Sequence, residues 1–154
     1  MILDSWASFE RNVATWVKSR VRPGIEFRNG YQAIPGFPSN RFRADALLTD
    51  GRSLLAVEVE LKQANPDTNV GKYWLLSRYR QYDSVVLFHI FTPAYNSYPW
   101  RLDLGRFYAE KMQQELPFEY ILMDHRKADN PEATLRQIQV AIESRIQHLG
   151  LDKV

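Results

Sequence analysis

Hydrophobic periodicity along the chain switches between helical and strand spacing and predicts an α/β fold. Apolar residues three and four positions apart predict a helix from Leu3 to Ser19, and alternating segments on either side of Asp50-Gly51 predict a β-hairpin. The expected strands are Ile25 to Asn29, Arg41 to Leu48, Ser53 to Lys62, Val85 to Phe91 and Phe118 to Met123. The later helices are expected at Asp67 to Tyr82, Arg101 to Leu116 and Pro131 to Leu149. This order predicts a mixed sheet with a central β-meander, flanked by helices on both faces.

The predicted hairpin brings acidic side chains together. In its second strand the apolar residues face one side, and the other side carries Ala56, Glu58, Glu60 and Lys62. A two-residue turn at Asp50-Gly51 would pair Thr49 with Arg52, Leu47 with Leu54 and Asp45 with Ala56. Asp45 and Glu58 would then be diagonal neighbours on one face, with backbones roughly 7–8 Å apart. Two carboxylates can close that separation onto one cation.

Composition narrows the kind of metal site that such a cluster can form. The 154 residues include no cysteine and only three histidines, which excludes thiolate sites and argues against a histidine-based one. Acids that converge on adjacent strands repel one another unless a cation lies between them. The expected ion is Mg²⁺, or Mn²⁺ in its place, because it accepts carboxylate ligands and keeps waters for chemistry. The alternative is that Glu58 and Glu60 simply line the solvated face of a hairpin.

The rest of the composition predicts a single globular domain over residues 1–154, with 45% hydrophobic and 25% charged residues. No apolar stretch approaches the roughly 20 residues that cross a bilayer, and the first residues lack a signal-peptide pattern. A cytoplasmic protein without membrane contact is therefore expected. Of the 20 basic residues 14 are arginines, which suit bidentate phosphate contacts, although a GC-rich genome produces the same bias.

In these residues the sequence resembles the PD-(D/E)XK nuclease superfamily, which includes restriction endonucleases and archaeal-type Holliday-junction resolvases. The family pattern has an acid on the second core strand and a hydrophobic third strand that ends in acid–any–lysine. Arg43-Ala44-Asp45-Ala46 matches the first part, and Leu55-Ala56-Val57-Glu58-Val59-Glu60 matches the second. The element order from Leu3 through Phe91 fits as well, so the resemblance implies a restriction-endonuclease-like core.

The resemblance also implies roles for individual residues. Asp45 and Glu58 match the two metal-binding acids, and Glu10 resembles an extra metal-shell acid on the first helix, its alternative being an exposed helical glutamate. The usual lysine position holds Glu60, which makes the motif acid–any–acid. Alternatively the motif is shifted by two, so that Glu60-Leu61-Lys62 is the acid–any–lysine. Lys72 on the following helix is either another basic donor or an ordinary surface residue.

The expected function is therefore hydrolysis of phosphodiester bonds in nucleic acid, foremost DNA, by a Mg²⁺-dependent endonuclease. Asp45, Glu58 and Glu60, with Glu10, would hold the metal. Lys62, Lys72 or Glu60 would position the attacking water. The candidates for phosphate-backbone contacts are Arg41, Arg43, Arg78 and Arg80. A homodimer would supply the two active sites that double-strand cleavage requires.

Two other classes of function stay open. The same fold can serve as a catalytically silent DNA-binding or regulatory module, which the missing strand lysine favours. The chain can also be an interaction protein whose acidic strand is merely solvated, with the aromatic segment from Phe91 to Trp100 as its partner surface. Metal binding separates the interaction protein from the other two, and cleavage separates the nuclease from the silent module. His89, His125 and His148 are expected to be ordinary residues.

Overall fold

A single mixed β-sheet organises the protein, for which a computed structural model describes residues 5–62, 65–96 and 98–152. The strand order is β1 (Glu26–Asn29), β2 (Ala46–Thr49), β3 (Ser53–Glu60), β4 (Ser84–Phe91) and β5 (Phe118–Asp124). The pairs β1–β2 and β2–β3 are antiparallel, whereas β3–β4 and β4–β5 are parallel. The predicted mixed sheet with its β-meander is confirmed.

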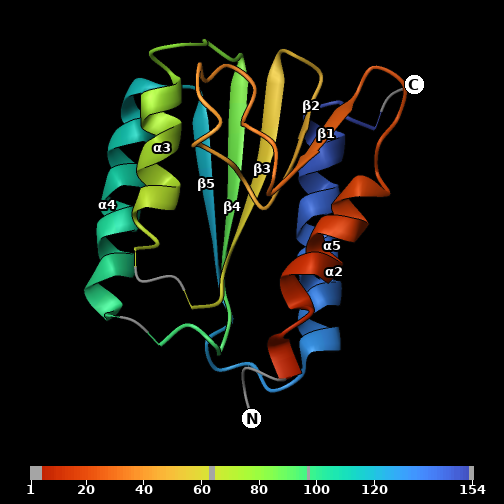
Figure 1. Cartoon of the computed structure of the whole chain (residues 1–154), viewed down its shortest axis with the longest axis vertical. Helices are drawn as coiled ribbons and strands as arrows, with labels where there is room; N and C mark the ends of the chain where they lie inside the picture. The colour runs from red at the N-terminus through yellow and green to blue at the C-terminus, as the bar shows by residue number, and fades with distance from the viewer. Residues whose placement is uncertain (1–4, 63–64, 97, 153–154) are drawn as a thin grey trace.

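Helices cover both faces of this sheet, as predicted (Figure 1). On one face lie α2 (Phe9–Lys18) and α5 (Pro131–His148), and on the other lie α3 (Thr68–Leu76) and α4 (Pro99–Glu115). Strands joined in parallel need a crossover, and a helix in the crossover necessarily packs on a face. As a result β3 and β4 are buried on both sides over most of their length.

The helices follow from local sequence signals. The buried residues of α2 are Phe9, Val13 and Val17, four positions apart, so they form one apolar stripe. At the start of α5 the side chain of Asn130 accepts a hydrogen bond of 3.1 Å from the Ala133 N–H, which satisfies a backbone donor that the helix leaves unpaired. Among the helices in the described part of the chain, none is long and apolar enough to cross a bilayer.

Two predicted elements extend further than the observed ones. The helix predicted from Asp67 to Tyr82 already ends at Leu76, because the Ser77 hydroxyl bonds the Trp74 carbonyl (2.6 Å) and competes with the helical pattern. The strand predicted from Arg41 begins only at Ala46, and the preceding segment makes a single isolated bridge between Arg43 and Ala33. The helix predicted from Leu3 to Ser19 contains α2, which begins at Phe9, and the predicted start at Leu3 lies outside the described residues.

The predicted hairpin register was wrong by two residues. Thr49 pairs with Leu54 and Leu47 with Ala56, so four residues, 50–53, separate the first paired positions, whereas the prediction had only Asp50 and Gly51 between them. Side chains stabilise the longer turn, since Asp50 Oδ1 accepts hydrogen bonds from the N–H groups of Arg52 (2.9 Å) and Ser53 (2.7 Å). A shift of two residues keeps every side chain on its predicted face. Continued by one residue, the register sets Asp45 opposite Glu58, not diagonal to it.

Candidate functional site

Five charged side chains from four segments meet at the end of the β2–β3 hairpin that lies away from its turn. Val57 is the partner of Ala46, so β3 extends beyond the start of β2 and its last residues lack a strand neighbour on that side. Glu58 and Glu60 occupy this projecting end, and Asp45 immediately precedes β2. Glu10 comes from α2 and Lys72 from α3, the helices on opposite faces of the sheet. The missing strand pairing creates the notch in which they meet.

Asp45 is held in place by the backbone of β3. Its Oδ2 atom accepts a hydrogen bond of 2.6 Å from the Val59 N–H, a donor that β2 no longer serves. Burial raises the pKa of Asp45, while hydrogen bonds from Glu10 and Val59 and the positive charge of Lys72 act in the opposite direction. Asp45 is thus an oriented carboxyl group with one oxygen committed to the backbone.

Glu10 forms a side-chain hydrogen bond with Asp45. Burial, a hydrogen bond with Asp45 and the negative charges of the neighbouring acids together raise the pKa of Glu10 to about 8. The hydrogen bond itself acts to raise the pKa of Glu10 and to lower that of Asp45, so Glu10 is the donor in this pair. The interpretation of Glu10 as an exposed helical glutamate does not hold, because its side chain is partly buried against the other acids.

Glu58 is the centre of a buried polar network. Its Oε2 atom lies 2.7 Å from Lys72 Nζ and accepts a hydrogen bond of 2.7 Å from the Tyr73 hydroxyl. Glu58 is 2% exposed, and this burial raises its pKa to about 8 even though Lys72 opposes the rise. Burial and the adjacent Glu58 also raise the pKa of Tyr73 well above its ordinary value, which keeps the hydroxyl a donor.

Lys72 is fixed by three acceptors and is not an ordinary surface lysine. Besides Glu58, its Nζ atom donates to the Arg43 carbonyl (2.5 Å) and to Asn69 Oδ1 (3.0 Å). An ammonium group has three donors, and all three are used. The lysine in contact with the acids therefore comes from α3. Lys62, the other candidate, lies beyond the end of β3 with an exposed side chain.

Glu60 points to a second set of polar groups at the carboxyl end of the parallel strands. Its Oε1 atom accepts a hydrogen bond from Asn69 Nδ2 and lies 3.2 Å from His89 Nε2. The other ring nitrogen of His89 is 2.7 Å from the Tyr120 hydroxyl, and burial followed by the charge of Glu60 raises the pKa of Tyr120. Among the described residues nothing bonds Glu60 Oε2, although the residue is fully buried.

His89 and Tyr120 were missed by sequence analysis, which took His89 as an ordinary residue. The register of β3 with β4 sets His89 opposite Glu58, and the register of β4 with β5 continues the row to Leu122. A polar residue in the middle of the apolar strand Ser84–Phe91 was the available signal. Its partner could not be named without the strand order.

The four predicted arginines are not gathered around the acids. Arg41 and Arg43 have exposed side chains, and only the backbone carbonyl of Arg43 contacts the cluster, through Lys72. Arg80 donates to the Gly51 carbonyl (2.8 Å) at the β2–β3 turn, the end of the hairpin away from Asp45. Arg78 is exposed beyond the C-terminal end of α3.

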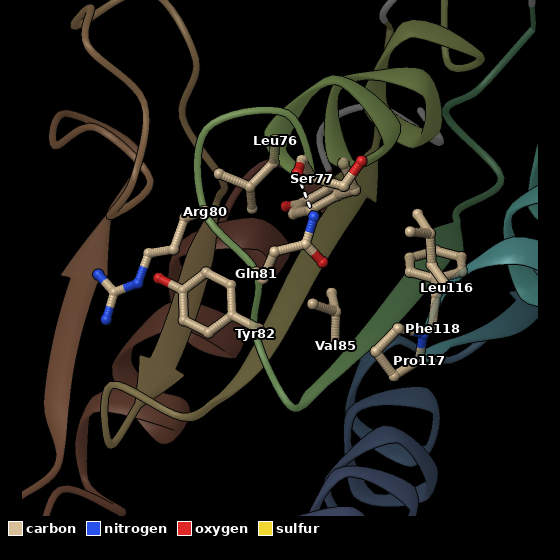
Figure 2. A pocket seen from close by; sticks show the side chains of 10 residues that line it. Leu76, Ser77, Arg80, Gln81, Tyr82, Val85, Leu116, Pro117 and Phe118 are labelled. Atoms are coloured by element: carbon tan, nitrogen blue, oxygen red, sulfur yellow. Dashed lines mark hydrogen bonds between the residues drawn. The ribbon is translucent and has the colours of Figure 1, made fainter.

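Two hollows differ in their relation to the acids. A cleft of about 620 Å³ runs along α2 and reaches Glu10 and Asp45. The pocket in Figure 2 lies at the other end of α3, between the Ser77–Tyr82 segment and Leu116 to Phe118. Its volume of about 20 Å³ is close to that of one water probe, so it has no room for a substrate. Of these two hollows, the cleft along α2 is the one that reaches the acids.

The carboxylates are chemically suited to a hard divalent cation, but in the described residues they are not arranged to chelate one. Carboxylate oxygens are the ligands that Mg²⁺ and Mn²⁺ prefer. Glu60 Oε2, which is buried and has no hydrogen-bond partner among the described residues, is an oxygen of this kind. Across the described residues, no three acidic or histidine side chains already stand in chelating positions. A proton between Glu10 and Asp45 and the ammonium of Lys72 beside Glu58 balance the charges instead.

Comparisons of the chain with protein-family models, curated proteins and solved structures find no match.

Proposed function

We propose that this protein is a metal-dependent nuclease with a PD-(D/E)XK-like core that hydrolyses phosphodiester bonds in nucleic acid, foremost DNA. The observation that carries the proposal is the convergence of Glu10, Asp45, Glu58 and Lys72 from α2, the start of β2, β3 and α3 in one notch of the sheet. Burying several acidic groups so close together lowers the free energy of unfolding, so stability alone does not explain the cluster. Clusters of ionisable groups with displaced pKa values are typical of functional sites.

The acids are the expected ligands for Mg²⁺ or Mn²⁺. Asp45 and Glu58 would hold the ion, with Glu10 and the free oxygen of Glu60 completing the set of donors. A bound divalent cation lowers the pKa of a coordinated water and stabilises negative charge on a phosphoryl group. The Val59 N–H holds Asp45 Oδ2 in place, which would orient this carboxylate for the ion.

Lys72 takes the role that the strand lysine has in the acid–any–lysine pattern. It donates to Glu58 without lying in the same strand, so Glu60 at the usual lysine position does not remove the positive charge from the notch. Beside an ion that Glu58 would hold, the Lys72 ammonium would orient a nucleophilic water or contact a phosphate oxygen. Tyr73 keeps its bond to Glu58 and limits the directions in which that carboxylate points.

A catalytically silent DNA-binding or regulatory module is the second candidate, favoured by one observation. Each of the four carboxyl groups already has a partner in the chain: Glu10 with Asp45, Glu58 with Lys72 and Tyr73, and Glu60 with Asn69. The charges are balanced without a cation, so the cluster is stable whether or not the protein cleaves a substrate.

Metal binding followed by cleavage separates the candidates. Isothermal calorimetry with Mn²⁺ is compared for the native chain, Asp45→Asn, and the control Asp103→Asn, which changes an exposed aspartate on α4. The nuclease proposal expects saturable binding in the native chain and control, its loss in Asp45→Asn, and matching loss of Mn²⁺-dependent cleavage of DNA. Binding without cleavage of DNA or RNA supports the silent module. Absence of binding at millimolar Mn²⁺ overturns the nuclease proposal.

A further inference from the structure

The cleft along α2 has two unlike walls. One wall is formed by Ala7, which precedes α2, and by a stripe of α2 that the helical repeat places on one side, namely Glu10, Arg11, Ala14, Thr15 and Lys18. The other wall is the end of β1 and the turn after it, formed by Phe27, Asn29, Gly30 and Tyr31. The volume of about 620 Å³ falls within the range of pockets that take a small organic molecule, roughly 300–1,000 Å³. A single nucleotide unit is of this size class, whereas a duplex is not.

Tyr31 stands on the rim of this cleft as an exposed aromatic ring. Its side chain is 88% exposed, the highest value among the large apolar side chains of the described residues. The backbone beneath it is held, since the Tyr31 N–H donates to Asn29 Oδ1 (2.9 Å) and the Asn29 N–H donates to Gln32 Oε1 (3.0 Å). A braced turn that presents an uncovered ring has the geometry of a stacking platform.

The wall opposite Tyr31 carries positive charge. Arg11 and Lys18 are exposed, lie seven residues apart on α2, and line the cleft on either side of the small residues Ala14 and Thr15. Two cations about two helical turns apart, roughly 10 Å, can contact different phosphates of one strand. The small side chains between them leave room for the chain that those phosphates join. Glu10, at the inner end of the same wall, marks where the strand would meet the candidate active site.

From these features we propose that the cleft binds single-stranded DNA, with an unpaired base stacked on Tyr31 and backbone phosphates on Arg11 and Lys18. This inference rests on the nuclease proposal, because it is the proposed active site at Glu10 and Asp45 that gives a reason for the cleft to guide a strand there. A paired base in a duplex has both faces covered by its neighbours, so only an unpaired base offers a face to Tyr31. The choice of DNA follows the nuclease proposal, whose expected substrate is foremost DNA.

Fluorescence anisotropy of a labelled oligodeoxynucleotide in EDTA tests the inference without cleavage. The native chain is compared with Tyr31→Ala and with the matched control Tyr79→Ala, a tyrosine 54% exposed outside the cleft. Loss of one stacked base is expected to weaken binding of the single strand roughly 5- to 150-fold in Tyr31→Ala, with Tyr31→Phe close to the native chain. Tyr79→Ala is expected to bind like the native chain.

Salt dependence tests the charged wall separately. In Arg11→Gln and in Lys18→Gln the slope of log affinity against log salt is expected to fall by about 0.7 for each lost phosphate contact to a single strand. The control Arg136→Gln, an exposed arginine on α5 outside the cleft, is expected to leave the slope unchanged.

Three results would overturn the inference: native affinity in Tyr31→Ala, tighter binding of duplex than of single strand, or equal affinity for RNA of the same sequence. These outcomes are distinct from failure of the nuclease proposal. A chain that binds single-stranded DNA through Tyr31 in EDTA, yet neither binds Mn²⁺ nor cleaves, supports this inference and contradicts the nuclease.

Discussion

Lys72 Nζ lies 2.7 Å from Glu58 Oε2, although the two residues belong to different elements, α3 and β3. The side chains are 10% and 3% exposed, so the pair is shielded from solvent. Such a pair contributes little net stability while both partners are present, but loss of one partner leaves a buried charge unbalanced. The contact therefore ties folding stability to the same groups that are proposed to bind metal.

Replacement of Lys72 by methionine is expected to destabilise the fold most strongly at alkaline pH. Well above pH 8, where the Glu58 carboxyl has lost its proton, the cost is expected to be about 3–5 kcal/mol, the range for breaking a buried ion pair. At acidic pH the cost is expected to be smaller, because Glu58 is then neutral. Urea denaturation at both pH values measures this difference. The double variant Lys72→Met/Glu58→Gln should recover most of the loss, and failure to recover would show that Lys72 stabilises chiefly through Arg43 and Asn69.

The protein is expected to lose stability as pH rises from about 4.5 to about 8. The pKa values of Glu10 and Glu58 rise from 4.5 to about 8 in the folded state, so over this window the folded chain binds protons that the unfolded chain has already released. The stability that these two groups contribute is fully present below pH 4.5. Above that pH it falls with a slope of up to about 1.4 kcal/mol per pH unit for each proton. Denaturation at a series of pH values checks the sign. Glu10→Gln should flatten the slope, and a native chain whose stability rises over this window would contradict the assignment.

Divalent metal is expected to raise the unfolding temperature of the native chain. A ligand that binds only the folded state stabilises it by about 2.7 kcal/mol at a concentration 100 times its Kd. Mn²⁺ should therefore shift the transition upward, EDTA should reverse the shift, and Asp45→Asn should abolish it. The control Asp103→Asn, an exposed residue of α4, should show the same Mn²⁺-induced rise in unfolding temperature as the native chain. An equal shift in Asp45→Asn would place the metal elsewhere.

Two glycines are expected to respond to alanine in opposite ways. Gly51 in the β2–β3 turn has φ +88°, a left-handed conformation that alanine adopts at a cost of about 1–2 kcal/mol. Gly71 lies inside α3, and an added Cβ would be 3.7 Å from the nearest atom of Tyr108, which is ordinary contact. Gly71→Ala is therefore expected to stabilise by about 0.5–1 kcal/mol. Thermal denaturation of both variants measures the pair, and a destabilised Gly71→Ala would mean that α3 and α4 pack too closely to admit a methyl group.

The sequence by itself determined the elements and the faces of the strands. Alternation from Leu55 to Glu60 placed Glu58 and Glu60 on one side, and this held even though the register was wrong by two residues, because side chains in a strand repeat every two residues. Asn130 and Pro131 located the start of α5 for a similarly local reason, since a cap involves residues only three apart. The acids Asp45 and Glu58 could be named because they sit in one hairpin.

Only the tertiary structure decided which side chains complete the cluster. The choice between Lys62 and Lys72, the burial of Glu10 against Asp45, and the contact of His89 with Glu60 all join residues from separate elements. The turn length was predicted wrongly, because it depends on hydrogen bonds that Thr49 Oγ1 and Asp50 Oδ1 accept from the backbone and that compete with a tighter turn. Periodicity reports which way a side chain faces. The strand order and the helices packed on the sheet determine which residues that side chain contacts.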